Sequence, residues 1–175
     1  MSRKRLLKFI QFLSAFLALI AFYFFFASGF SKNDLLLQDN PMFFDRSGAL
    51  LRFIPDKNGE RHLWLKGGEI PAIVKNAFIV AEDQRFYSHN GFDLTAIARA
   101  VKDNVSAGRI TSGASTITQQ TVRLLHPRKR TYHDKLIEIL KAARLELALS
   151  KDEILEQYLN RVPMGNNITG VELAS

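Results

Sequence analysis

The chain has 175 residues, which is enough for one globular domain with an additional segment but too few for two full domains. It contains no cysteine, so disulfide bonds and thiolate metal sites are excluded. The formal net charge is +7, but four of the 24 basic residues stand in the first eight positions, so the rest of the chain is only mildly basic and no nucleic-acid partner is expected.

The N-terminal segment has the pattern of a membrane anchor. Residues 9–30 carry no charge, and at about 1.5 Å per residue a helix of this length crosses a hydrocarbon core of about 30 Å. The basic tail, residues 1–8, predicts a cytoplasmic N-terminus by the positive-inside rule. A signal peptide cleaved near Ala27-Ser28-Gly29 is the alternative, but its apolar region would be shorter. We therefore expect one transmembrane helix over residues 9–30.

Residues 31–70 predict a juxtamembrane linker with a small β element. Residues 43–53 are typical of a hairpin whose turn is Asp45 to Gly48, because glycine adopts positive φ without strain. A further short strand is expected over His62 to Leu65, ended by Gly67-Gly68. These strands carry no recognisable chemistry.

Residues 71–175 predict a helical domain. Helices are expected from Pro71 to Glu82, from Asp93 to Gly108, from Ser115 or Thr116 to Leu125, from Tyr132 to Leu149 and from Ile154 to Asn160. Ser150 to Glu153 has the pattern of a capping box before the last of these helices. The long helix has an apolar stripe that we expect to face the core, made of Leu136, Ile139, Leu140, Ala143 and Leu147.

Two adjacent carboxylates, Glu82 and Asp83, mark the point where the first of these helices gives way to a loop. A helix holds the position of Glu82 while the loop admits a substrate, an arrangement that suits a general base. Ordinary surface charge at a helix end is the alternative.

A cluster of hydroxyl and amide groups begins the third helix, at Ser115, Thr116, Thr118, Gln119 and Gln120. Free N–H groups and side-chain donors at a helix N-terminus can bind an anion, although simple capping would also explain the hydroxyls. A basic strip follows, made of Arg123, Arg128, Lys129, Arg130 and Lys135. Such a strip fits either a diphosphate or lipid headgroups.

Two further candidates have simpler explanations. Glu138 follows Lys135 by three residues, and an ion pair along the helix accounts for it. His89 fits a packed loop histidine, and no second histidine stands at a spacing that would build a zinc site.

Five ordered segments resemble the motifs of glycosyltransferase family 51, the peptidoglycan glycosyltransferase domain of class A penicillin-binding proteins. They are Glu82-Asp83-x-x-Phe86-x-x-His89-x-Gly91, Gly113-Ala114-Ser115-Thr116-Ile117-Thr118-Gln119-Gln120, Lys135-x-x-Glu138, Lys151-x-x-Ile154-Leu155-x-x-Tyr158-Leu159-Asn160, and Gly165 with Gly170 to Ala174. The resemblance covers about residues 45–175, and it is greatest to the 1C-type branch of the family. Five motifs in order are much more specific than any one of them.

The resemblance implies a mainly α, lysozyme-like domain at the outer face of the bacterial cytoplasmic membrane. It implies polymerisation of lipid II into β-1,4-linked glycan with inversion and release of undecaprenyl diphosphate. The implied partners are lipid II, the growing glycan chain, the membrane and other cell-wall synthesis proteins. A divalent cation, Mg or Mn, is the one cofactor that the resemblance allows.

The resemblance also implies roles for single residues. Glu82 is the expected base, and Glu138 the second carboxylate, near the donor diphosphate and able to hold a metal. Substrate binding is expected from Asp83, Phe86, His89, Ser115, Thr116, Gln119, Gln120, Arg123, Lys135 and Asn160.

Two features depart from the family pattern. Asp134 stands where an arginine is usual, and Arg128 or Arg130 would have to replace that cation. The printed sequence also stops just after the fifth motif, so we expect a helical core that is incomplete at its C-terminal end. Two alternative functions remain open: a lytic transglycosylase or muramidase that cleaves glycan, and a tethered protein that binds lipid II without catalysis.

Overall fold

The structure is a computed structural model that describes residues 3–27, 30, 32–37, 39–127, 129 and 131–174. The chain divides into two units, Met1–Phe30 and Ser31–Ser175. The first unit holds one helix, α1 (Arg3–Ala27), which covers most of the predicted span, while residues 28 and 29 of that span lie outside the described part. A search of the described residues finds no helix that is long and apolar enough to cross a bilayer.

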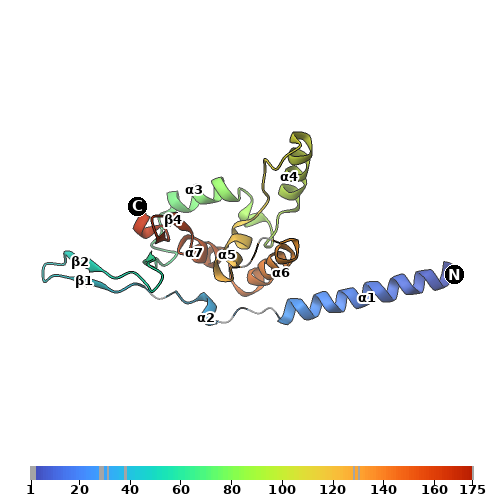
Figure 1. Ribbon diagram of the computed structural model, residues 1–175, viewed down its shortest axis with the longest axis horizontal. Coiled ribbons are helices and arrows are strands. Elements are labelled where there is room, and N and C mark those ends of the chain that lie inside the picture. Colours follow the sequence, from blue (N-terminus) through green and yellow to red (C-terminus); the bar gives the residue numbers. More distant parts are fainter. Residues whose placement is uncertain are drawn as a thin grey trace. The chain divides into compact units, whose positions relative to one another are not determined.

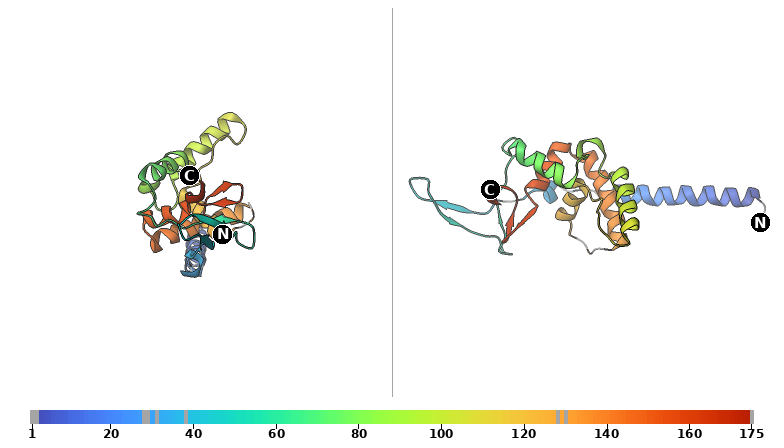
Figure 2. Two further views of the ribbon diagram at one scale, coloured as in Figure 1. Left: turned by 90° about the vertical axis from the view of Figure 1, so that its left-hand side faces the viewer. Right: turned by 90° about the horizontal axis from the view of Figure 1, so that it is seen from above.

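The second unit begins with a short helix and a hairpin. Helix α2 (Lys32–Leu35) precedes β1 (Met42–Phe44), which pairs in antiparallel fashion with β2 (Leu50–Phe53). The predicted hairpin is confirmed, and its turn is held by Asp45, whose Oδ1 accepts hydrogen bonds from the backbone N–H groups of Ser47 and Ala49. The hairpin extends away from the helices of this unit (Figures 1 and 2).

A second small sheet joins the two ends of this unit. Its strand order is β3 (Arg61–His62), β5 (Ile168–Thr169) and β4 (Pro163–Gly165). Strand β3 is parallel to β5, and β4 is antiparallel to it. The strand expected over residues 62–65 is therefore shorter and begins one residue earlier, because its partner β5 extends over only two residues.

The rest of the unit is helical, as predicted. Its elements are α3 (Ala72–Glu82), η1 (Phe86–Ser88), α4 (Leu94–Ala107), α5 (Ile117–Leu125), α6 (Tyr132–Ala148), α7 (Lys151–Leu159) and η2 (Glu172–Ala174).

The helix ends follow local chemistry. Asp93 caps α4, Thr116 caps α5, and Ser150 with Glu153 forms the predicted capping box of α7. Gly108 ends α4 in the left-handed conformation with φ 62°.

Helix α5 lies against both α6 and α7 and forms the centre of the core (Figure 1). Its buried apolar residues are Ile117 and Val122. The neighbouring helices contribute Ala142, Leu145, Ile154, Leu155 and Leu159. The buried face of α5 also includes polar residues, and these build the site described below.

The expected inward face of the long helix is wrong, and two other helices bury less than their apolar patterns suggest. The inward face of α6 contains Lys141, Ala142 and Leu145, whereas Leu136 and Leu147 of the predicted stripe are exposed. Apolar residues lie on more than one side of α6, so their spacing alone does not select the buried side. Helix α3 has no buried residue, although its apolar pattern suggests one. The apolar face of α4 is likewise exposed at Leu94, Val101 and Val105.

Candidate active site

Glu82 is the last residue of α3, and its side chain is exposed. The helix is closed by the backbone N–H of Asp83, which donates to the carbonyl of Ile79 at 2.9 Å. The carboxylate of Glu82 accepts a hydrogen bond from Nε2 of Gln120, with 2.9 Å between the two atoms. A rigid helix and one amide from α5 therefore fix this carboxylate while leaving it open to a ligand.

The neighbouring carboxylate, Asp83, has a different environment because it is buried. Its Oδ2 accepts from the backbone N–H of Ile117 and lies 3.0 Å from Nε2 of His89. An anion at the first turn of a helix is stabilised by the free N–H groups and the helix dipole. Asp83 thus joins the loop after α3 to the start of α5.

Thr116 and Gln119 attach the same loop to α5 from the other side. The hydroxyl of Thr116 donates to the carbonyl of Gly91 at 2.7 Å and accepts from the backbone N–H of Gln119. Gly91 has φ +86°, and a Cβ there would meet the backbone of Ala142 on α6 at 2.8 Å. Only glycine fits this close approach, which explains the residue that ends the first motif.

Lys135 is the centre of a polar cluster on α6. Its Nζ donates to Oγ of Ser115 at 2.9 Å, to Oε1 of Gln119 at 2.7 Å and to Oε1 of Glu138 at 2.6 Å. The ion pair with Glu138 expected from the sequence is present, but the two other contacts cross to α5 and its N-terminal loop. Lys135 therefore fixes α6 against the helix that orients Gln120.

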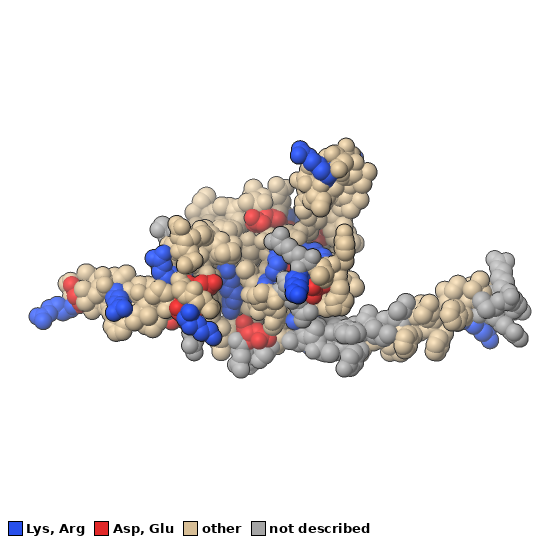
Figure 3. Space-filling view, in the orientation of Figure 1, with Lys and Arg blue, Asp and Glu red and all other residues tan. Residues whose placement is uncertain are grey.

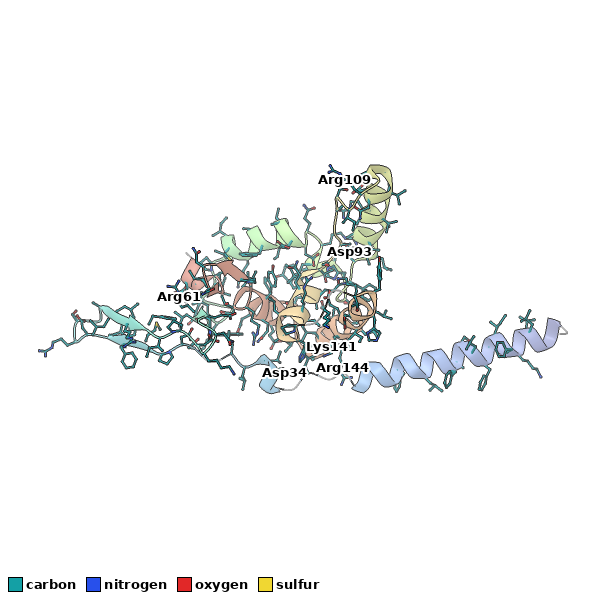
Figure 4. The ribbon with its side chains drawn as sticks, viewed as in Figure 1. Asp34, Arg61, Asp93, Arg109, Lys141 and Arg144 are labelled. Atoms are coloured by element: carbon teal, nitrogen blue, oxygen red, sulfur yellow. The ribbon has the colours of Figure 1, made fainter. Side chains whose placement is uncertain are left out.

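A smaller cavity of about 190 Å³ surrounds Glu82. Arg85 and Arg99 line it together with Asp93, which lies where the loop enters α4 (Figure 4). The Thr95 hydroxyl, which donates to Asp93, holds the pKa of that carboxyl below its usual range. The wall also includes residues 112–116, which lead into α5.

A larger cavity of about 560 Å³ lies beside α5 and α6. Its basic lining residues are Arg123, Lys129, Lys135 and Lys141, and its acidic ones are Asp134 and Glu138. Basic and acidic side chains lie side by side over this part of the helical unit in Figure 3. Ser115 lines both cavities, so the two cavities are neighbours.

Asp134 has a structural reason for its place in the larger cavity. It lies in the first turn of α6, where Thr131 Oγ1 donates to its Oδ2 at 2.6 Å and accepts from its backbone N–H at 3.0 Å. This reciprocal cap stabilises the start of the helix. Arg128 and Arg130, the expected replacements for the missing arginine, lie outside the described residues.

Some predicted substrate ligands lie in the interior instead. The Phe86 side chain is fully buried, with Nζ of Lys151 4.5 Å from the centre of its ring. The amide of Asn160 exchanges two hydrogen bonds with the backbone of Leu65, at 2.7 and 2.8 Å. These contacts hold the fold around the cavities, and direct contacts of Phe86 and Asn160 with substrate stay predictions.

The structure adds residues that the sequence did not single out. Arg99 lines the cavity of Glu82. It is the one charged residue in the first two turns of α4, and this isolated charge could have indicated a candidate site residue from the sequence. Lys141 lines the larger cavity from the inward face of α6. The sequence does not predict this burial, because Lys141 is not part of the apolar stripe that was expected to face the core.

The side chains of the larger cavity do not form a protein metal site. Across the described residues, no group of three or more His, Asp or Glu side chains could hold an ion. Glu138 is already paired with Lys135, and the cavity is lined by more cations than carboxylates. A divalent cation would need most of its ligands from a substrate diphosphate, so the expected Mg or Mn stays a prediction.

Comparison with known proteins decides the family. A family model described as Transglycosylase matches residues 47–175. The chain belongs to the transglycosylase family. Membership predicted from the five motifs is thereby confirmed.

Individual relatives agree with the family match. Penicillin-binding protein 4 of Bacillus subtilis (strain 168) is 39% identical over 144 residues, which are 82% of this chain and 23% of that protein. Penicillin-binding protein 1A of Neisseria cinerea is 43% identical over 117 residues, which are 66% of this chain and 15% of that protein. The protein of the same name in Neisseria flavescens is 44% identical over 117 residues. The chain spans less than a quarter of the length of these relatives, which are of types 4 and 1A, so the 1C-type branch is not confirmed.

Proposed function

We propose that this transglycosylase domain is a peptidoglycan glycosyltransferase that polymerises lipid II into β-1,4-linked glycan strands. The observation that carries the proposal is a pair of cavities that share Ser115 as a lining residue, one with the carboxylate of Glu82 and one lined by Arg123, Lys129, Lys135 and Lys141. A base beside one sugar and cations beside a diphosphate are what this reaction requires. Family membership and a mainly helical fold, as expected of a lysozyme-like domain, support the same reading.

In the proposed reaction, Glu82 takes the proton from the 4-hydroxyl of the acceptor sugar. The oxygen attacks the anomeric carbon of the growing chain from the face opposite the diphosphate, and the C–O bond to the diphosphate breaks. The electron pair of that bond leaves with undecaprenyl diphosphate, and the configuration changes from α to β. The proton removed from the hydroxyl remains on the Glu82 carboxylate until water accepts it.

The leaving group explains why the reaction needs cations beside the donor and no acid to protonate the diphosphate. A diphosphate departs already ionised, so catalysis depends on charge placed where the negative charge grows. Arg123 offers a bidentate contact to phosphate oxygens, and Lys135 a point charge. Glu138 orients Lys135 through the bond of 2.6 Å between their side chains.

The proposal places the enzyme at the bacterial cytoplasmic membrane. Residues 9–30 would anchor the chain with its N-terminus in the cytoplasm and the helical unit outside, beside other cell-wall synthesis proteins. The uncharged run and the basic residues before it support this placement. Anchoring would raise the local concentration of a substrate confined to the same plane. Retention in membranes after carbonate extraction would support the anchor, and release into the soluble fraction would contradict it.

The test of the function is incubation of the purified chain with fluorescent lipid II, followed by gel separation of the products. A ladder of glycan strands is expected. Bound but unextended lipid II would instead support the tethered binding protein. Release of soluble muropeptides from isolated sacculi would support the lytic alternative.

A further inference from the structure

Tyr158, on α7, is linked to Glu82 through one side chain. Its hydroxyl donates to Oε1 of Gln120 at 3.4 Å, and Nε2 of the same amide donates to Glu82 at 2.9 Å. The Tyr158 ring is buried and meets Phe78 edge to face, with centroids 6.0 Å apart and an angle of 78°. Phe78 lies about one turn before Glu82 on α3, so Tyr158 contacts the helix that carries the carboxylate as well as the amide that holds it.

We propose that Tyr158 is a positioning residue for the Glu82 carboxylate and acts through Gln120. The inference rests on the proposed function, since it assumes that Glu82 is the base. Tyr158 itself does not line either cavity, so its effect on the reaction is indirect.

The direction of the Gln120 amide is what Tyr158 controls. An amide has one donating end and one accepting end, whereas an ionised carboxylate only accepts. Glu82 is held only when Nε2 faces it, and in this orientation Oε1 accepts from the Tyr158 hydroxyl, so both ends of the amide are bonded. In the rotated amide, an oxygen would face the carboxylate and repel it.

Tyr158 is suited to be a permanent donor. Burial, and secondly the negative charge of Glu82, raise the pKa of Tyr158 to about 12, while Arg123 acts in the opposite direction. The phenol therefore keeps its proton at neutral pH. Its helix is rigid, because a capping box begins it and Ile154, Leu155 and Leu159 bury its inner face.

The test compares Tyr158→Phe with Tyr87→Phe in the full chain. The first change removes the hydroxyl but keeps the ring against Phe78. The second removes an exposed hydroxyl that donates to Asp152 at 2.9 Å, outside both cavities. We expect Tyr158→Phe to lower kcat about two- to fivefold, as for the loss of one weak hydrogen bond, with KM and the melting temperature unchanged. Tyr87→Phe should keep the wild-type kcat.

A double-mutant cycle with Gln120→Leu decides whether the effect passes through Gln120. If it does, Tyr158→Phe has no further effect on kcat in the Gln120→Leu background. Additive losses, or a wild-type kcat for Tyr158→Phe, would overturn the inference while leaving the proposed function intact.

A second readout does not need activity. In chain labelled with 15N-glutamine, the side-chain amide resonances of Gln120 should shift in Tyr158→Phe and in Glu82→Gln but not in Tyr87→Phe. Unchanged resonances in Tyr158→Phe would refute the link. An inactive wild-type chain would contradict the proposed function, and the resonances would then decide the link between Tyr158 and Gln120 on their own.

Discussion

Replacing Lys135 with alanine should reduce both stability and activity, for reasons that can be separated. The Nζ of Lys135 is 2.7 Å from Oε1 of Gln119, whose side chain is 1% exposed. Without Lys135 this buried acceptor loses a charged donor, which costs about 1–3 kcal/mol. The partly exposed pair with Glu138 adds at most about 1 kcal/mol. For a chain of this size the melting temperature should fall by about 2–16 °C.

The activity of Lys135→Ala should fall further than its stability suggests. Removing the positive charge beside the diphosphate should cost about as much as a hydrogen bond to a charged group, about 1.5–3 kcal/mol, and should reduce kcat/KM about ten- to a hundredfold. Initial rates of lipid II polymerisation and a thermal melt followed by circular dichroism would measure the two effects.

Two variants separate charge from scaffolding at this position. Lys129→Ala removes another cation from the same cavity without touching the Gln119 contact, so its melting temperature should stay near wild type while its rate falls. Lys135→Arg keeps the charge and should recover part of the rate. An unchanged rate in Lys135→Ala would show that Lys135 only holds the helices together. An unchanged melting temperature would refute the argument from the buried Gln119 acceptor.

Three other perturbations follow from the geometry. Gly91→Ala should destabilise the fold by about 2–5 kcal/mol, because φ is +86° and the new Cβ meets the α6 backbone at 2.8 Å. Gly68→Ala is the control in thermal melts, because a Cβ at Gly68 meets open space. Asp134→Arg should lower the KM for the donor by adding a cation, at a cost of about 0.5–1 kcal/mol for the lost carboxylate in the first turn of α6; an unchanged KM would show that the donor does not approach this wall. The raised pKa of Tyr158 means that the folded state favours the neutral phenol, so this stabilisation is full below pH 10 and is lost towards pH 12. Between these two pH values, the free energy of unfolding measured with denaturant should fall more steeply with pH in wild type than in Tyr158→Phe. Equal dependence on pH in the two proteins would contradict the shift.

Features fixed by neighbouring residues are predictable from this sequence. The caps at Asp93 and at Ser150 with Glu153, and the hairpin turn at Asp45, depend on side chains that bond to backbone within four residues. Such contacts need no knowledge of the rest of the fold, and the structure contains them as expected.

Features fixed by distant residues are not predictable in this way. Asp83 stands beside Glu82 in the sequence, yet one is buried against Ile117 and the other is open, because the contact depends on a helix more than thirty residues later. The inward side of α6 likewise depends on distant elements such as α5, and it buries Lys141 and Ala142 rather than the most apolar stripe. The motifs indicated which residues gather, but not which of them support the cavities from behind.

The central claim is that Glu82 acts as the base, and Glu82→Gln tests it most directly. The substitution keeps the size of the side chain, and its amide oxygen can still accept from Gln120, so the circular dichroism melt should match wild type. Loss of a general base should lower the rate about a hundred- to ten-thousandfold, and no glycan ladder should form from fluorescent lipid II within the time in which wild type consumes it. Polymerisation by Glu82→Gln at a rate near that of wild type would contradict the account.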